Sequence, residues 1–89
     1  MKIVYDYPPN YDKIAATFKL SPGVVFTYGE TIYNPSGSVI DPALLVHEAK
    51  HVQQQWGDPA GWWERYLVDP VWRVSQELAD YRLQYRKAK

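Results

Sequence analysis

The chain has 89 residues, of which ten are acidic and ten are basic, and it contains no cysteine. The balanced charge gives no electrostatic reason to expect binding to nucleic acid or to an anionic membrane, and the missing cysteines exclude disulfides, cysteine zinc sites and thiol nucleophiles. We expect one domain over residues 1–89. A domain of this size buries only about 60 to 65% of the surface of its unfolded chain, so a bound metal ion would contribute to its stability.

Two features of the sequence bear on where the protein works. No apolar run approaches the roughly 18 to 20 residues of a membrane span, and the N-terminal MKIVYDY lacks the long apolar core of a signal peptide. We therefore expect a cytoplasmic protein without a membrane partner, and we expect it to be a monomer.

The first half of the chain predicts short strands and one helix. Residues 1–7 alternate apolar and polar side chains as a strand does, and two prolines end this pattern. Residues 11–20 have the apolar spacing of a short amphipathic helix. Two β-rich runs then flank Gly29, which predicts a hairpin, and the turn-forming sequence NPSG follows at residues 34–37.

Three Asp-Pro pairs, at Asp41, Asp58 and Asp69, predict the starts of three helices in the second half. An aspartate at the N-cap accepts hydrogen bonds from free backbone N–H groups, and proline suits the first helical position, where no donor is needed. The predicted helices cover residues 42–56, 60–68 and 70–87. Gly57 suits the left-handed position that commonly follows a helix.

The sequence VHEAKHVQQQW, in the first of these helices, contains the only two histidines, His47 and His51. Residues four apart lie one above the other on a helix, so both imidazoles can bind one zinc ion at about 2.0 to 2.1 Å. Glu48 is rotated by about 100° from His47, so it is expected to accept a proton from a zinc-bound water and return it to a leaving amine. The opposite face is expected to pack in the core and carries Leu45, Ala49, Val52 and Trp56.

A catalytic zinc site with two histidines needs a third protein ligand. Glu77 is our choice, because it lies within the last predicted helix at the edge of an apolar stripe that we expect to pack on the histidine helix. The stripe consists of Val74, Leu78, Tyr81 and Tyr85. The other acidic candidates are Glu64, Asp58, Asp69 and Asp80.

Together these residues resemble the short HExxH zinc metallopeptidases of gluzincin type, which include very small single-domain forms and peptidases inferred in phages and prophages. The resemblance covers about residues 27–84, through TIYNP, LLVHEAKHVQQQW and ELADYRLQ. It implies zinc as the cofactor, ligated by His47, His51 and Glu77, with Glu48 as the general base and a peptide or protein as the substrate. A phage-encoded member would work in the cytoplasm of its bacterial host.

The resemblance also implies a fold. It predicts the α+β class, with a small antiparallel sheet, an active-site helix and a long C-terminal helix, and an edge strand that receives an extended peptide beside the metal. At the position where several gluzincins have an aspartate that orients a histidine, this chain has Tyr81, and Asp80 lies one residue early.

Several roles stay open at the level of sequence. An oxyanion donor is needed when water attacks a carbonyl, and the candidates are Tyr28, Tyr33, Tyr66 and Tyr81. A group of aromatic residues is expected to pack between helices, with lining of the substrate site as the lesser alternative: Trp56, Trp62, Trp63, Tyr66 and Trp72.

The sequence therefore predicts a zinc-dependent metallopeptidase. The alternative is a non-catalytic zinc-stabilised domain with a structural or interaction role, of phage origin in one version. Hydrolysis of a different amide or of a cell-wall cross-link would use the same chemistry on another substrate.

Overall fold

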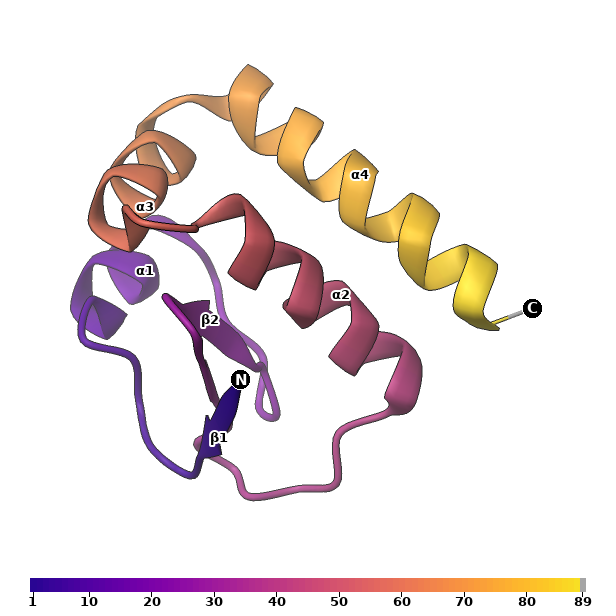
Figure 1. Cartoon of the computed structure of the whole chain (residues 1–89). Helices are drawn as coiled ribbons and strands as arrows, with labels where there is room; N and C mark the ends of the chain where they lie inside the picture. Colours follow the sequence, from indigo (N-terminus) through magenta and orange to yellow (C-terminus); the bar gives the residue numbers. More distant parts are fainter. Residues whose placement is uncertain (89) are drawn as a thin grey trace.

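The computed structural model describes the backbone of residues 1–88 and the side chains of residues 1–79. Its elements are, in chain order, β1 (Lys2–Val4), α1 (Tyr11–Thr17), β2 (Phe26–Tyr28), β3 (Thr31–Tyr33), α2 (Pro42–Gln54), α3 (Pro59–Val68) and α4 (Pro70–Ala88). The predicted α+β class is confirmed. Helix α2 lies between the sheet and α4, and α4 runs antiparallel along it (Figure 1). None of the described helices combines the length and apolar character needed to cross a bilayer.

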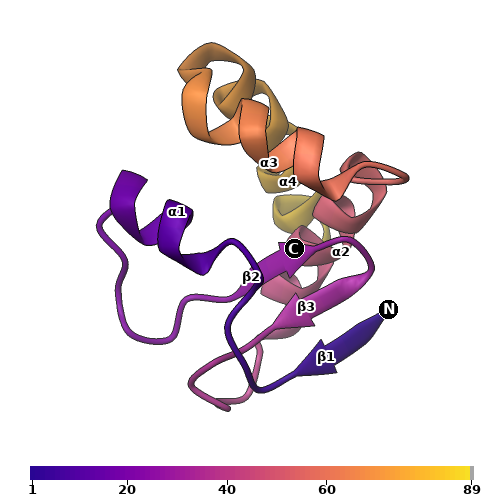
Figure 2. The ribbon, with the colours of Figure 1, turned by 90° about the vertical axis from the view of Figure 1, so that its left-hand side faces the viewer.

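The sheet has the strand order β1-β3-β2, which leaves β2 at one edge (Figure 2). Strands β2 and β3 form the predicted antiparallel hairpin, in which Tyr28 pairs with Thr31 and Gly29 adopts a φ of 65°. Strand β1 instead pairs with β3 in parallel, with Ile3 beside Ile32. The prediction of an antiparallel sheet is therefore wrong for β1, because α1 and β2 between the two strands provide the long connection that parallel pairing requires.

The three Asp-Pro pairs begin helices as predicted. The carboxylates of Asp41, Asp58 and Asp69 accept hydrogen bonds from backbone N–H groups two or three residues later, at 2.8, 2.9 and 3.0 Å. Gly57 adopts a φ of 78°, which suits its predicted place after α2. Helix α2 ends at Gln54, two residues earlier than predicted, so the chain turns before Trp56.

A small aromatic core holds α1, the sheet and α3 together. Its buried members are Ile14, Phe26, Trp62 and Trp63, with Tyr66 and Trp72 packed against them. The Trp62 ring stacks on Tyr66 at 4.7 Å and meets Trp72 edge-on at 5.7 Å. Packing between helices is thus confirmed for this aromatic group, except that Trp56 is 75% exposed because α2 ends before it.

The buried faces of α2 and α4 differ from the buried faces that the sequence predicts. Helix α2 buries His47, Glu48 and His51, whereas the predicted stripe of Leu45, Ala49 and Val52 is only partly buried. On α4, Val74 and Leu78 are exposed, and Tyr81 and Tyr85 lie outside the described side chains. The predicted apolar contact between these helices is therefore wrong for the described residues, because a seam of polar groups that satisfy one another takes its place.

Candidate metal centre

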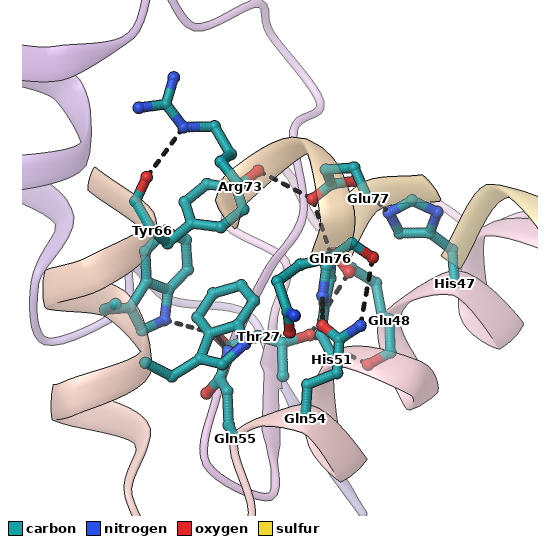
Figure 3. Close-up of polar contacts among 12 residues, drawn as sticks. Thr27, His47, Glu48, His51, Gln54, Gln55, Tyr66, Arg73, Gln76 and Glu77 are labelled. Atoms are coloured by element: carbon teal, nitrogen blue, oxygen red, sulfur yellow. Dashed lines mark hydrogen bonds and ion pairs between the residues drawn. The ribbon is translucent and has the colours of Figure 1, made fainter. Parts of the chain in front are cut away.

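Two imidazoles from α2 and one carboxylate from α4 meet in the seam between the helices (Figure 3). His47 Nε2 lies 3.1 Å from Glu77 Oε2, and His51 Nε2 lies 3.1 Å from Glu77 Oε1. Both histidines are buried, at 7% exposure. Because α2 and α4 pack along each other, the carboxylate reaches imidazoles on two successive turns.

The three side chains offer the donor set of a zinc site. One ligand atom from each lies within 4.8 Å of the others. In a tetrahedral site with bonds of about 2.0 to 2.1 Å, neighbouring ligand atoms are about 3.4 Å apart. The two His–Glu separations of 3.1 Å are close to this value, so small side-chain adjustments suffice to coordinate an ion. The residues therefore fit zinc, with the fourth position left to solvent or substrate.

The same groups support one another electrostatically in the zinc-free protein. Burial alone would lower the pKa of His47, but the hydrogen bond to Glu77 and the negative charges of Glu48 and Glu77 outweigh it, so the pKa lies above its ordinary value of 6.5. Burial would raise the pKa of Glu77, but its hydrogen bonds to His47, His51 and Tyr66 hold that pKa well below its ordinary value of 4.5. The carboxylate thus stays ionised, as a metal ligand must.

Gln54 orients the ring of His51. Its side-chain nitrogen donates to the carbonyl of Gln76 at 3.1 Å, so its oxygen faces His51 Nδ1 at 2.9 Å. The Nδ1–H of His51 therefore donates to Gln54, and Nε2 is directed toward Glu77 and the candidate metal position. Trp62 Nε1–H in turn donates to the side-chain oxygen of Gln76 at 2.9 Å. This chain of contacts ties α2, α3 and α4 together around the histidine.

Tyr66 supports the carboxylate of Glu77. Its hydroxyl donates to Glu77 Oε1 at 2.8 Å. The tyrosine is held in turn by α4, because Arg73 Nε donates to the Tyr66 carbonyl at 2.8 Å and the guanidinium lies over the ring. Tyr66 therefore contacts a candidate ligand directly.

Glu48 lies on the face of α2 that is turned toward the sheet and is 5% exposed. The hydroxyl of Thr27, on β2, lies 3.4 Å from Glu48 Oε2 and 3.3 Å from the Glu48 carbonyl oxygen. Glu48 is therefore fixed next to the histidines without being part of the group of three converging ligand atoms. This position agrees with the rotation of about 100° between His47 and Glu48 on a helix.

Two backbone groups in and next to β2, which is an edge strand, already make hydrogen bonds to side chains of the protein. The carbonyl of Thr27 accepts hydrogen bonds from Gln55 Nε2 at 2.9 Å and from Trp63 Nε1 at 2.8 Å. The N–H of Gly29 donates to Gln55 Oε1 at 2.8 Å. Since Gln55 is 1% exposed, this contact is part of the folded core. An extended peptide therefore cannot pair with these two backbone groups while these hydrogen bonds are in place.

A cavity of about 350 Å³ opens beside the candidate ligands. Its lining includes His47, Glu48, His51 and Glu77, together with residues of α1, of the segment before β2 and of the Trp62–Trp63 pair in α3. Among the tyrosines considered as oxyanion donors, Tyr66 lines this cavity, whereas Tyr28 and Tyr33 do not. The side chain of Tyr81 lies outside the described part of the chain.

The other acidic candidates whose side chains the structure describes lie elsewhere. Asp58 and Asp69 cap α3 and α4, and Glu64 is exposed on α3. The side chain of Asp80 falls outside the described residues. Of the described candidates, Glu77 is therefore the carboxylate that meets both histidines.

Sequence reasoning missed four residues that support the site, namely Thr27, Gln54, Gln55 and Gln76. Gln54 could have been noticed, because it lies three residues after His51 and hence on the same face of the helix. The others act across the fold, and no local pattern indicates them. No family model, curated protein or solved structure matches the chain.

Proposed function

We propose that this protein is a zinc-dependent metallopeptidase that hydrolyses peptide bonds with Glu48 as the general base. The observation that carries the proposal is the meeting of His47, His51 and Glu77 in the wall of a cavity that Glu48 also lines. A zinc ion held there would polarise the substrate carbonyl and lower the pKa of the attacking water.

The residues of the chain take distinct parts in this proposal. Glu48 takes the proton from the attacking water and passes it to the nitrogen of the leaving amine. Thr27 holds the Glu48 side chain in place through its hydroxyl. Tyr66, which lines the cavity, is the described tyrosine best situated to donate to the developing oxyanion, for which its single O–H must turn away from Glu77 Oε1.

Metal analysis is the first test. The purified protein should contain one zinc ion per chain at neutral pH, and His47→Ala should lose it. A wild-type protein that binds no zinc at micromolar concentration would end the proposal.

Glu48→Gln is the second test, because glutamine keeps the size of the side chain and its hydrogen bond with Thr27. Zinc content and thermal stability should be retained, while turnover of a peptide library should fall by about 10²- to 10⁴-fold. Glu64→Gln, on the exposed surface of α3, is the matched control and should keep wild-type turnover. Equal activity of the two variants would exclude Glu48 as the base.

The alternative is a zinc-stabilised domain without activity. It is supported by the position of the three ligands, which lie between two helices of a protein with a small core. Glu48 argues against it, since a purely structural site needs no base and usually has four protein ligands. Two results together would favour this alternative. Zinc would raise the Tm of the wild-type protein, and the zinc-loaded protein would hydrolyse none of the substrates tested.

A further inference from the structure

We propose that an exposed apolar patch on α4 is the contact surface of a weak dimer, in which a second copy of the chain packs its own α4 antiparallel against the first. The α4 patch consists of Val71, Val74 and Leu78. It lies outside the candidate metal centre, so the dimer does not depend on the proposed function.

The fold leaves the α4 patch in water. Val71 is 82% exposed, Val74 is 56% exposed and Leu78 is 49% exposed. At 3.6 residues per turn, the three lie within about 60° of one another around the helix and about 60° to 120° from Glu77, which meets the histidines of α2. The side of α4 that carries the patch is therefore not the side that α2 covers. Three apolar neighbours on one side of a helix are typical of an interaction site, whereas single exposed apolar residues are common on any surface.

The spacing of the α4 patch is that of a helix that pairs with another helix. Val71, Val74 and Leu78 are separated by three and then four residues, and the sequence continues this alternation with Tyr81 and Tyr85. Apolar residues at such intervals are the a and d positions of a coiled coil, where the side chains of each helix insert between those of the other. A second copy of the chain has the same spacing. The surface is therefore complementary to itself, as a two-fold symmetric dimer requires.

The charges along α4 favour the antiparallel arrangement. Residues 82–88, at the end of the helix, include two arginines and one lysine but no acidic residue. Residues 64–73, around its start, include two acidic and two basic residues. In a parallel dimer the two basic ends would lie side by side and repel each other. In an antiparallel dimer each basic end lies near the electrically balanced start of the other helix, so this repulsion is avoided.

The length of α4 limits the strength of the dimer. The helix has 19 residues and is therefore about 28 Å long and about 10 Å wide. Contact along one side covers roughly 300 Å² of each copy in projection, compared with about 800 Å² per partner in a stable interface. The dimer should therefore be reversible, with a Kd on the order of 10 to 300 µM.

Sedimentation equilibrium of the zinc-free protein tests the association. From about 5 µM to about 1 mM protein, the average mass should rise from that of one chain toward that of two. Val74→Glu and Val71→Glu each place a charge in the contact and should weaken association at least about tenfold. Val39→Glu, the same change at a fully exposed residue outside α4, is the control and should keep the wild-type Kd. Thermal unfolding identifies any variant that does not fold. A wild-type protein that stays monomeric at the highest concentration, or an equal Kd for a folded patch variant and the control, would overturn the inference.

A spin label at position 68 distinguishes the two orientations. Val68 ends α3 and is 75% exposed, and the chain has no cysteine, so Val68→Cys provides one labelling site per copy. In an antiparallel dimer the two labels should be roughly 30 Å apart, because each lies about ten residues from Leu78 at the centre of the contact. Parallel helices would bring the labels within roughly 10 to 15 Å of each other. A dimer with the short distance would overturn the antiparallel arrangement.

Discussion

Replacing Gln54 by leucine should weaken zinc binding by about 10- to 100-fold. The Gln54 side chain receives the Nδ1–H of His51 and donates to the Gln76 carbonyl, so it orients one ligand and ties α2 to α4. Loss of such an outer partner commonly lowers metal affinity by about 10- to 100-fold, which corresponds to about 1.4 to 2.7 kcal/mol. Leucine has a similar size, so the change removes the hydrogen bonds without emptying the space.

Competition with a chromophoric chelator measures this effect, with Gln53→Leu as the control. Gln53 is exposed one residue earlier on the same helix. In the zinc-free protein, two lost hydrogen bonds of about 1 kcal/mol each should lower the free energy of unfolding by about 2 kcal/mol and the Tm by roughly 8 to 16 °C. Equal zinc affinity of the two variants would refute the argument that Gln54 orients His51.

Three further predictions concern the same region. Tyr66→Phe keeps the ring but loses the hydroxyl bonded to Glu77, so zinc affinity in the chelator assay should fall by about tenfold; unchanged affinity would mean that the hydroxyl does not position the carboxylate. Gln55→Leu leaves the Gly29 N–H without its acceptor and should lower the free energy of unfolding in urea by about 1 to 3 kcal/mol; a change as small as that of a surface substitution would contradict this role. The zinc-free protein should be most stable between about pH 4.5 and 6.5. Because folding lowers the pKa of Glu77, its carboxylate stabilises the folded state above pH 4.5, and this stabilisation is lost as the pH falls through the pKa of the folded state. Because folding raises the pKa of His47, its imidazolium stabilises the folded state below pH 6.5, and this stabilisation is lost as the pH rises through the pKa of the folded state. Thermal unfolding in the presence of a chelator checks this, and a Tm that climbs steadily to pH 8 would count against it.

Features set by neighbouring residues were predictable from the sequence. The Asp-Pro pairs begin helices because the carboxylate and the proline act within one turn, as the contact between Asp41 and the Ala43 N–H shows. The spacing of His47 and His51 places both on one face of a helix for the same local reason. The α+β class followed from the resemblance.

Features set by packing were less predictable. Glu77 lies beside both histidines, but the reason for expecting it there was wrong, because Val74 and Leu78 of the supposed contact stripe are exposed. The spacing of apolar residues can identify the buried face of a helix only when that face consists of apolar side chains. Here the buried seam is built of imidazoles, carboxylates and amides that bond to one another, and such pairing depends on distances that no local pattern contains. The parallel placement of β1 is a similar case, since it depends on the path of the chain through α1 and β2.

The ligands also come from well-separated parts of the chain, since the histidines precede α3 and the carboxylate follows it. During synthesis, His47 and His51 are translated before Glu77, so the growing polypeptide has only two of the three candidate donors until residue 77 is added. A single proteolytic nick in the turn between α3 and α4 would likewise break the covalent link between the imidazoles and the carboxylate. The group of three candidate ligands is therefore complete only when α2 and α4 have both been made and have packed together.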